Sequence, residues 1–158
     1  MNSEFTIAVH CLIELAKNTS GHLYSSEALS QKVHTHSARV RKIMSTLRKN
    51  ELVVTKEGIR GGYRLNLDPR EITLALVYRA IACEALKLNW CSCSESDPEL
   101  ISVRMVMDQA FGEAEVLLEE YLERLTIDSL LRQAEKVRES LSCLCPENIP
   151  SDPQSIDK

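Results

Sequence analysis

The segment 56-KEGIRGGYRLNL-67 contains three glycines and two arginines, and its glycines lie between two short apolar runs, 52-LVVT-55 and 63-YRLNL-67. In the second run apolar residues alternate with polar ones, which is the period of a half-buried strand. Glycines between two strands allow positive φ and close backbone approach at the tip of a hairpin. A nucleotide-binding phosphate loop would need them between a strand and a helix N-terminus. The segment therefore predicts a tight hairpin with Arg60 at its tip, either merely exposed to solvent or reaching DNA.

Three helices are predicted ahead of this hairpin. Residues 4–17 repeat apolar side chains at helical spacing, and residues 26–33 follow Ser25, which is a suitable N-cap. A short polar break leads into a third helix over 38–52, whose faces other than the apolar stripe carry basic residues. The apolar stripe of this third helix is Val40, Ile43, Met44 and Leu47. Two short helices joined by a tight turn, with a hairpin directly after the basic one, predict a winged helix-turn-helix.

The charge distribution favours a nucleic-acid partner for the first half of the chain. The net charge of −4 alone argues against such a partner. Residues 1–66, however, carry 10 Lys and Arg against 5 Asp and Glu, a net of +5, and the remainder carries 9 against 18, a net of −9. Nine basic residues fall within 31–64, where only Glu51 and Glu57 offset them. Such a face is either simply solvated or binds an acidic partner such as DNA.

Long helices dominate the second half. Helices are predicted over 71–88, with Thr73 as N-cap, and over 127–141 after Thr126. Between them, a helix over about 98–125 has apolar residues that step alternately by four and three positions, a heptad pattern. This heptad seam consists of Val103, Met107, Ala110, Ala114, Leu117 and Tyr121. At roughly 1.5 Å per residue the helix is about 40 Å long, which favours pairing with a second copy over packing within one chain.

These patterns predict a mainly α fold with one small β-hairpin: a winged helix-turn-helix domain and a long dimerisation helix. We expect a DNA-binding domain over 1–88, a cysteine-bearing loop over 89–97, dimerisation helices over 98–142 and a disordered tail over 143–158. No apolar run is long enough to span a membrane, and the N-terminus lacks the basic start of a signal peptide. We therefore expect a cytoplasmic protein whose six cysteines begin reduced.

Two stretches, 36-HSARVRKIMSTLRKNELV-53 and 58-GIRGGYRLNLDPREITLALVYRAI-81, resemble the Rrf-type bacterial transcription regulators. That family includes an iron–sulfur cluster regulator, a nitric-oxide-sensitive repressor and a cysteine-metabolism repressor. The resemblance covers roughly residues 3–135, and its specific part is the wing GGYRL followed by P-x-x-ITL-x-x-V-x-x-AI. It implies a homodimeric winged-helix regulator, with a recognition helix in the major groove and a long C-terminal helix that pairs two subunits.

The resemblance also implies which residues face double-stranded DNA. They are His36, Ser37, Arg39, Arg41 and Lys42 on the recognition helix and Lys56, Arg60 and Gly61 on the wing, to which we add Ser25 before the second helix. Physical reasoning agrees, because residues near the N-terminus of a recognition helix reach base edges. Arg39 is the best candidate for reading a guanine, whereas Lys42, Arg48 and Lys49 are better suited to phosphates.

The cysteines depart from the family pattern. Cluster-binding members carry three spaced cysteines just before the long helix, whereas this chain has 91-CSC-93 there and its next cysteines in 143-CLC-145. An iron–sulfur cluster on Cys83, Cys91 and Cys93 is one interpretation, and a four-thiolate zinc site built from the two C-x-C pairs is another. Neither spacing is usual, so we expect no bound cofactor.

A thiol–disulfide switch is the sharper hypothesis, because clustered cysteines in loops are candidates for oxidant sensing. The candidate sensing residues are Cys91, Cys93, Cys143 and Cys145. A bond between the two pairs would shift the helices that set the spacing of DNA half-sites. The alternative is that these thiols have no role, and Cys11 and Cys83 are expected to be small core residues.

Two classes of function remain. The first is a dimeric, sequence-specific transcription regulator, most simply a repressor, that responds to thiol oxidation or to a bound protein partner, metal or cluster. The second is an interaction module that binds a protein partner without reading DNA sequence. A steep fall of DNA affinity with salt would favour the first. An enzyme is not expected, because the chain shows no catalytic triad, paired-carboxylate arrangement or nucleotide fingerprint.

Overall fold

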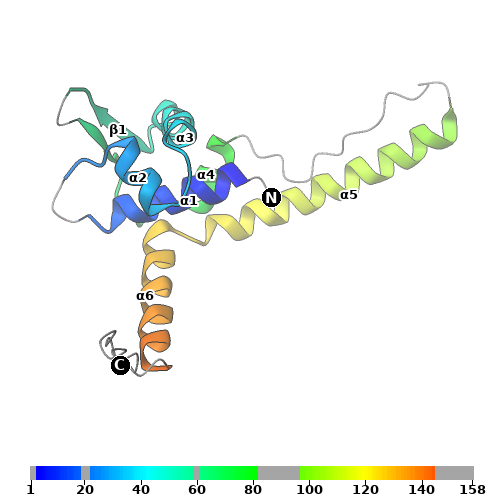
Figure 1. The fold of residues 1–158 in the computed structure, drawn as a ribbon. Coiled ribbons are helices and arrows are strands. Elements are labelled where there is room, and N and C mark those ends of the chain that lie inside the picture. The colour runs from blue at the N-terminus through cyan, green and yellow to red at the C-terminus, as the bar shows by residue number, and fades with distance from the viewer. Residues whose placement is uncertain (1–2, 19–21, 59–60, 82–96, 145–158) are drawn as a thin grey trace, which may run out of the picture.

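The computed structural model describes residues 3–18, 22–58, 61–81 and 97–144 (Figure 1). Its elements are α1 (Ser3–Ala16), α2 (Ser26–Lys32), α3 (Ser37–Lys49), β1 (Val53–Lys56), β2 (Gly62–Leu65), α4 (Leu74–Ala80), α5 (Pro98–Glu123) and α6 (Ile127–Leu144). The first four helices and the hairpin form one body, α5 extends far beyond it, and α6 leaves the base of α5 in another direction (Figure 1). The predicted fold class, mainly α with a small hairpin, is confirmed.

One aliphatic core joins the body to the base of the long helices. Its fully buried members include Leu12 of α1, Leu29 of α2, Met44 of α3 and Val77 of α4. Leu122 near the end of α5 and Ile127 at the start of α6 belong to the same cluster. The ring of Phe5 meets that of Tyr78 edge to face, with centroids 5.9 Å apart. The C-terminal helices are therefore anchored in the body at their junction.

The apolar stripe predicted for α3 is confirmed, since Val40, Ile43, Met44 and Leu47 are all buried. The helix ends earlier than the predicted residue 52, however. Glu51 adopts a φ of 58°, and the amides of Glu51 and Leu52 donate to the carbonyls of Arg48 and Leu47, both at 3.0 Å. These two bonds form a Schellman motif, which satisfies the last carbonyls of the helix and turns the chain into β1.

The hairpin is the predicted wing, and a third segment pairs with it. β1 runs antiparallel to β2, from Val53 opposite Leu65 to Lys56 opposite Gly62. Tyr24, just before α2, exchanges two backbone hydrogen bonds with Tyr63, at 3.1 and 2.8 Å. The wing is thus fixed to the entrance of α2 as well as to the end of α3.

The second half differs from its prediction mainly at the ends of helices. The predicted N-cap Thr73 is confirmed, since its hydroxyl accepts the amide of Leu76 at 3.2 Å, and α4 accordingly begins at Leu74 within the segment predicted from residue 71. The predicted continuation of this helix through 82–88 lies outside the described residues. Thr126 caps α6 as expected, since its hydroxyl accepts the amide of Ser129 at 3.1 Å. Of the helices described, none combines the length and the apolar character that crossing a membrane requires.

Candidate nucleic-acid interface

Three predicted DNA contacts lie at the N-termini of the helix-turn-helix. Ser25 is the N-cap of α2, and its hydroxyl accepts the amide of Ala28 at 3.1 Å. His36 occupies the N-cap position of α3 without a side-chain capping bond, and it is exposed. Ser37 follows as the first helical residue and is partly buried. These polar side chains stand where the two helices begin.

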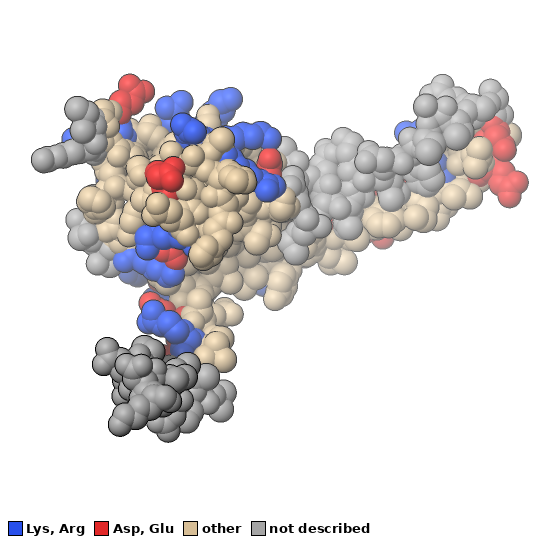
Figure 2. Space-filling view, viewed as in Figure 1, with Lys and Arg blue, Asp and Glu red and all other residues tan. Residues whose placement is uncertain are grey.

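The solvent face of α3 is basic and open. Its exposed residues opposite the buried stripe are Ala38, Lys42, Ser45 and Lys49. Their spacing of four, three and four residues places them on one face of the helix. Figure 2 shows Lys and Arg side chains gathered over α3 on one side of the body. A polyanion could therefore approach this helix along most of its length.

The arginines of α3 lie on the flanks of this basic face and differ in their partners. Arg39, the predicted guanine reader, donates a hydrogen bond to the hydroxyl of Ser3 in α1. Arg48 donates to Thr55 of β1 at 3.5 Å, so its flank faces the wing. Arg41 lies two turns before Arg48 and is exposed, and within the described ranges no side chain pairs with it. The structure thus leaves Arg41 more available than Arg39.

Glu4 is a residue of this site that the sequence analysis did not identify. Its carboxylate accepts a hydrogen bond from Lys42 at 2.9 Å. The Lys42 side chain is 71% exposed and that of Glu4 only 26%, so the acid sits at the inner edge of the basic face. The two residues are 38 positions apart, and no local pattern could have predicted their contact. A negative charge therefore lies within the surface proposed to meet phosphates.

The wing contributes a backbone geometry that only glycine permits. Gly58 has a φ of 111°, and a Cβ on Gly61 would lie 2.1 Å from the carbonyl oxygen of Lys56. The predicted role of these glycines in forming a tight tip is confirmed by this geometry. Lys56 is exposed at the end of β1, whereas Arg60 lies outside the described residues. Lys56 and Gly61 are thus close together at the tip of the wing.

A buried carboxylate holds α1 and α2 together beneath the site. Glu14 is 6% exposed and forms ion pairs with Lys17 and, at 3.2 Å, with Lys32 of α2. Burial alone would raise the pKa of the Glu14 carboxyl, but hydrogen bonds and charges from both lysines lower it below the ordinary 4.5. Lys32 also lies 5.5 Å from the centroid of the Tyr24 ring, which is part of the wing junction.

The described part of the chain places only one cysteine side chain. Cys11 is fully buried in α1, as predicted for a core residue. Burial, and to a lesser extent the Glu14 carboxylate, raises the pKa of this thiol to about 12. Cys143 lies in the last turn of α6, while Cys83, Cys91, Cys93 and Cys145 lie outside the described residues. Within those ranges, no group of three or more His, Cys, Asp or Glu residues could hold a metal ion.

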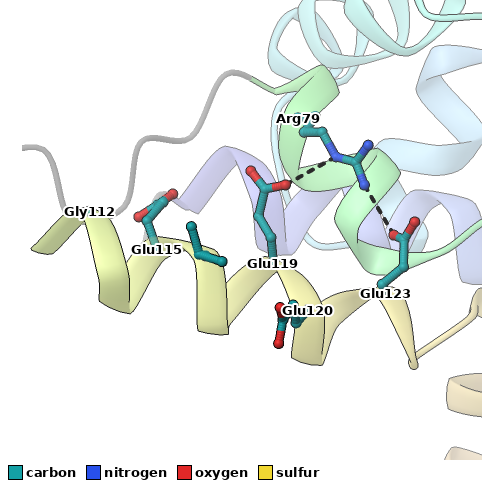
Figure 3. A pocket seen from close by; sticks show the side chains of 7 residues that line it. Arg79, Gly112, Glu115, Glu119, Glu120 and Glu123 are labelled. Carbon is teal, nitrogen blue, oxygen red and sulfur yellow. Dashed lines mark hydrogen bonds and ion pairs between the residues drawn. The ribbon is translucent and has the colours of Figure 1, made fainter.

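An open hollow lies between α4 and α5, away from the basic face (Figure 3). Its lining consists of Arg79, Gly112, Glu115, Val116, Glu119, Glu120 and Glu123. The guanidinium of Arg79 is paired with Glu119 at 3.4 Å and with Glu123 at 3.1 Å. The hollow is therefore a junction between two helices in which the one basic side chain of the lining is already engaged.

The sequence profile of the Rrf2 family, described as iron-dependent transcriptional regulators, matches residues 1–133. YwnA of Bacillus subtilis, which is assigned as an HTH-type transcriptional regulator, is 34% identical over 83 residues. That match spans 51% of this chain and only 58% of the length of YwnA.

Solved structures share the fold at lower identity. A protein of Lactobacillus plantarum assigned as a transcriptional regulator matches with a TM-score of 0.73 at 20% identity, over 90% of this chain and 99% of its own. CymR, the global cysteine regulator of B. subtilis, matches with a TM-score of 0.61 at 21% identity, over 84% of this chain and 96% of its own. At these identities the likeness supports the winged-helix fold and no particular ligand.

Proposed function

Because the chain belongs to the Rrf2 family of transcriptional regulators, we propose that it acts in the cytoplasm as a homodimeric repressor that binds two half-sites on double-stranded DNA. Members of this family are regulators of transcription and not enzymes. The observation that carries the proposal is the basic, exposed face of α3 beside the wing (Figure 2). A dimer bound across a promoter would exclude the transcription machinery from it.

In the proposed complex, α3 enters the major groove of DNA. That groove is about 12 Å wide and admits one helix. Arg39 and Arg41 flank the first turns of α3, where side chains reach base edges, and a guanidinium can bind guanine through two hydrogen bonds. Lys42 and Lys49 lie on the outer face and would contact phosphates. Ser37 and His36, at the helix start, would donate to the adjacent backbone.

The wing and α2 would bind the flanking DNA backbone. Lys56 supplies a cation at the end of β1, and the close-packed backbone at Gly61 lets the tip approach without a side chain in the way. Arg60 would extend from this tip toward a phosphate or the minor groove. Ser25, whose neighbour Tyr24 is bonded to the wing, brings the start of α2 to the same contact.

The dimer would form through the heptad seam of α5. In the single chain four of the six seam residues are exposed, among them Val103 at 50%, Leu117 at 66% and Tyr121 at 60%, while Met107 and Ala114 are half-buried. Large apolar side chains that recur at heptad spacing and face water are suited to pack against the same seam of a second copy. Val106, at 68%, widens this surface. Two copies joined in this way present two α3 helices, as a two-half-site operator requires.

We further propose that oxidation of the paired cysteines regulates binding. Its support is chemical. Cys11 is a buried core residue, whereas the four candidate thiols occur as two C-x-C pairs elsewhere in the sequence. Two thiols would give two electrons and two protons to hydrogen peroxide, which leaves as two waters while one S–S bond forms. A bond from the segment around Cys91 and Cys93 to that around Cys143 and Cys145 would couple the start of α5 to the end of α6.

The test is fluorescence anisotropy of the purified protein on the DNA upstream of its own gene, at fixed salt, against a scrambled duplex. Arg41→Gln should weaken binding to the specific duplex far more than to the scrambled one, by about tenfold for one bidentate base contact. Lys136→Gln, an exposed change of equal charge on α6, is the matched control. Equal binding of both duplexes by the unmodified protein would instead support an interaction module that does not read sequence.

The same assay tests the thiol switch. Peroxide should change the affinity of the reduced protein, and a thiol reductant should restore it. Replacing Cys91, Cys93, Cys143 and Cys145 by serine should abolish the response, whereas Cys11→Ser should retain it because that thiol is buried. An unchanged affinity after peroxide treatment would reject the switch and leave a ligand, metal or protein partner as the signal.

A further inference from the structure

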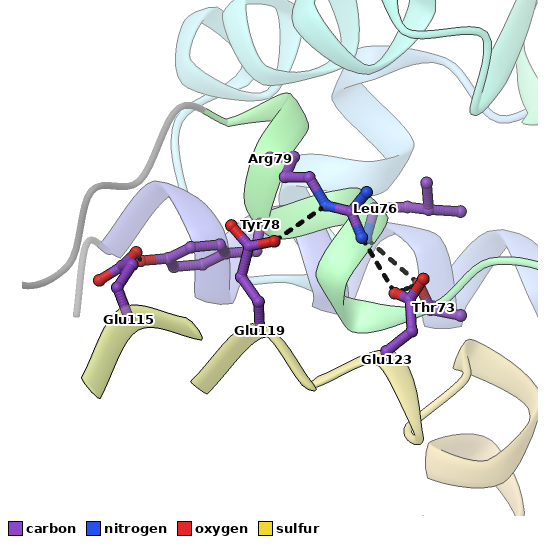
Figure 4. Close-up of polar contacts among 7 residues, drawn as sticks. All are labelled: Thr73, Leu76, Tyr78, Arg79, Glu115, Glu119 and Glu123. Carbon is purple, nitrogen blue, oxygen red and sulfur yellow. Dashed lines mark hydrogen bonds and ion pairs between the residues drawn. The ribbon is translucent and has the colours of Figure 1, made fainter. Parts of the chain in front are cut away.

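Three glutamates on α5 form a ladder that faces α4. Glu115, Glu119 and Glu123 are spaced by four residues and so share one side of the helix. Each of them contacts α4 or its N-cap (Figure 4). The hydroxyl of Tyr78 donates to Glu115, and Arg79 pairs with Glu119 at 3.4 Å and with Glu123 at 3.1 Å. These contacts therefore hold one face of α5 against α4 and so orient the axis of α5 relative to the DNA-binding body.

Thr73 completes the ladder and ties it to the start of α4. Its hydroxyl donates to Glu123 at 2.9 Å and accepts the amide of Leu76 at 3.2 Å (Figure 4). One hydroxyl thus both caps α4 and contacts α5. A change in the angle between the two helices would break the first of these hydrogen bonds while the cap stays in place.

Among the described residues, the backbone hydrogen bonds that join α5 to the rest of the fold lie at its base. The amide of Leu74 donates to Leu125 at 2.8 Å, and that of Ile127 donates to Ile72 at 2.9 Å. Leu122 is buried near this junction, whereas Leu100 and Val106 toward the other end are more than half exposed. The junction can therefore act as a pivot, and the contacts of the ladder set the angle at which α5 leaves it.

The length of α5 makes this angle matter. With 26 residues, α5 is about 39 Å long at roughly 1.5 Å per residue. A tilt of about 5° at the base would move the far end by about 3 Å, close to the rise of roughly 3.4 Å per base pair along the axis of DNA. A small error at the ladder would therefore misplace a recognition helix by about one base pair.

The ladder is suited to setting direction rather than to supplying stability. The side chains of Arg79 and Glu123 are 50% and 52% exposed, and ion pairs this exposed contribute little to the free energy of unfolding. The planar guanidinium nevertheless constrains the direction of its partners, because its donors lie in a fixed fork. Reaching two carboxylates one turn apart orients Arg79 along the axis of α5.

We propose that Arg79, with Thr73 and Tyr78, is a positioning residue that sets the angle between the DNA-binding body and α5 and thereby the spacing of half-sites that the dimer accepts. This inference rests on the proposed function, since only a dimer on two half-sites has a spacing to select. The angle itself is a property of a single chain and can be measured without DNA.

The first experiment measures this angle within one protomer. Genetically encoded spin labels replace Ser45 on α3 and Ser102 on α5, both of which are exposed, and labelled protein is diluted into an excess of unlabelled protein. Pulsed electron resonance should give a narrow distance distribution for the otherwise unchanged chain. Arg79→Gln should broaden or shift it, while Arg132→Gln, which removes a comparable guanidinium–carboxylate pair within α6, should not.

The second experiment measures affinity for duplexes whose half-sites are moved one base pair closer or farther apart. Arg79→Gln should reduce the preference for the best spacing by about fivefold, the lower end of usual couplings between sites, without a matching fall in thermal stability. A narrow, unshifted distribution and an unchanged spacing preference would overturn the proposal. If Arg79→Gln does not fold, Glu119→Gln removes one rung from the side of α5 and serves in both measurements. If the unmodified protein binds no DNA, the proposed function fails and the distance measurement still decides the role of the ladder in setting the angle.

Discussion

Glu51 occupies a backbone position that glycine usually fills. It follows the C-cap of α3 with a φ of 58°, in the left-handed region that is unfavourable for residues with a Cβ. Glu51→Gly should therefore stabilise the protein. Removing the Cβ relieves a steric cost of about 1–2 kcal/mol in the folded state, and this exceeds the roughly 0.4–1 kcal/mol by which the greater conformational entropy of glycine stabilises the unfolded chain. Urea unfolding should show a net gain of about 0.5–1 kcal/mol. Glu51→Ala is the matched control, because it removes the same charge but keeps the Cβ, and an equal gain from both would assign the effect to charge.

Glu14 makes stability depend on pH in a predictable direction. Its carboxyl pKa is lowered in the folded state, so its contribution is present above the ordinary pKa of 4.5 and is lost as pH falls through the folded value. Glu14→Gln should cost about 1–2 kcal/mol at pH 7, because the hydrogen bonds to Lys17 and Lys32 lose their charged acceptor. The difference between the two proteins should shrink in urea titrations below pH 4.5. A difference that stays constant with pH would show that the charge of Glu14 is not what stabilises the α1–α2 contact.

At the scale of elements, α1 restrains the helix proposed to read DNA. Glu4 forms an ion pair with Lys42. A phosphate that binds Lys42 must therefore displace the Glu4 carboxylate, which also repels it. Glu4→Gln should therefore raise the affinity for DNA by about two- to fivefold, as expected for an exposed pair worth up to about 1 kcal/mol. Anisotropy titrations at low salt would measure the gain. As a control for net charge, Glu135→Gln on α6 removes the same charge and should leave the affinity for DNA unchanged. If the gain comes from freeing Lys42, Glu4→Gln should no longer raise the affinity in a protein that already carries Lys42→Gln.

The elements themselves could be predicted because their signals are local. The stripe of α3, the caps at Ser25, Thr73 and Thr126, and the glycines of the wing each depend on residues a few positions apart. The early end of α3 could not be predicted, because glutamate is not a residue type that usually adopts the positive φ found at Glu51. Contacts such as Glu4 with Lys42 join positions 38 residues apart and follow only from packing. The role of the predicted site residues in binding DNA stays a prediction, and the sequence could not foresee the partners that restrain them.

The seam of α5 should control assembly. Leu117 is 66% exposed in the single chain, so a charge there barely perturbs the folded protomer but would be buried in a dimer. Leu117→Glu should weaken the dimer by about 100-fold or more, as for an unpaired charge within an interface core. Sedimentation velocity would detect the shift to monomer. Gln109→Glu adds the same charge on another face of α5 and should remain dimeric; dissociation of both variants would point to net charge, not the seam.

At the scale of the whole molecule, the two charge regions occupy different parts of the fold. Lys and Arg side chains gather over α3 (Figure 2), whereas the acids of α5 occur from Glu99 to Glu123 along a helix that extends away from the body (Figure 1). A phosphate near α3 meets mainly the nearer charges, since salt screens interactions beyond about 10 Å at 0.1 M. The net charge of −4 is therefore a poor guide to how this chain meets DNA.

This separation predicts a steep salt dependence in spite of the negative net charge. Each phosphate that a cation neutralises adds about 0.9 to the slope of log affinity against log salt. Lys49→Gln removes one such cation from the outer face of each α3, so a dimer should lose about 1.8 units of slope on any duplex sequence. Lys136→Gln on α6 makes the same change in net charge and should leave the slope unaltered. If the slope of the unmodified protein were near zero, or if both lysines lowered it equally, the basic face of α3 would not be the surface that meets DNA.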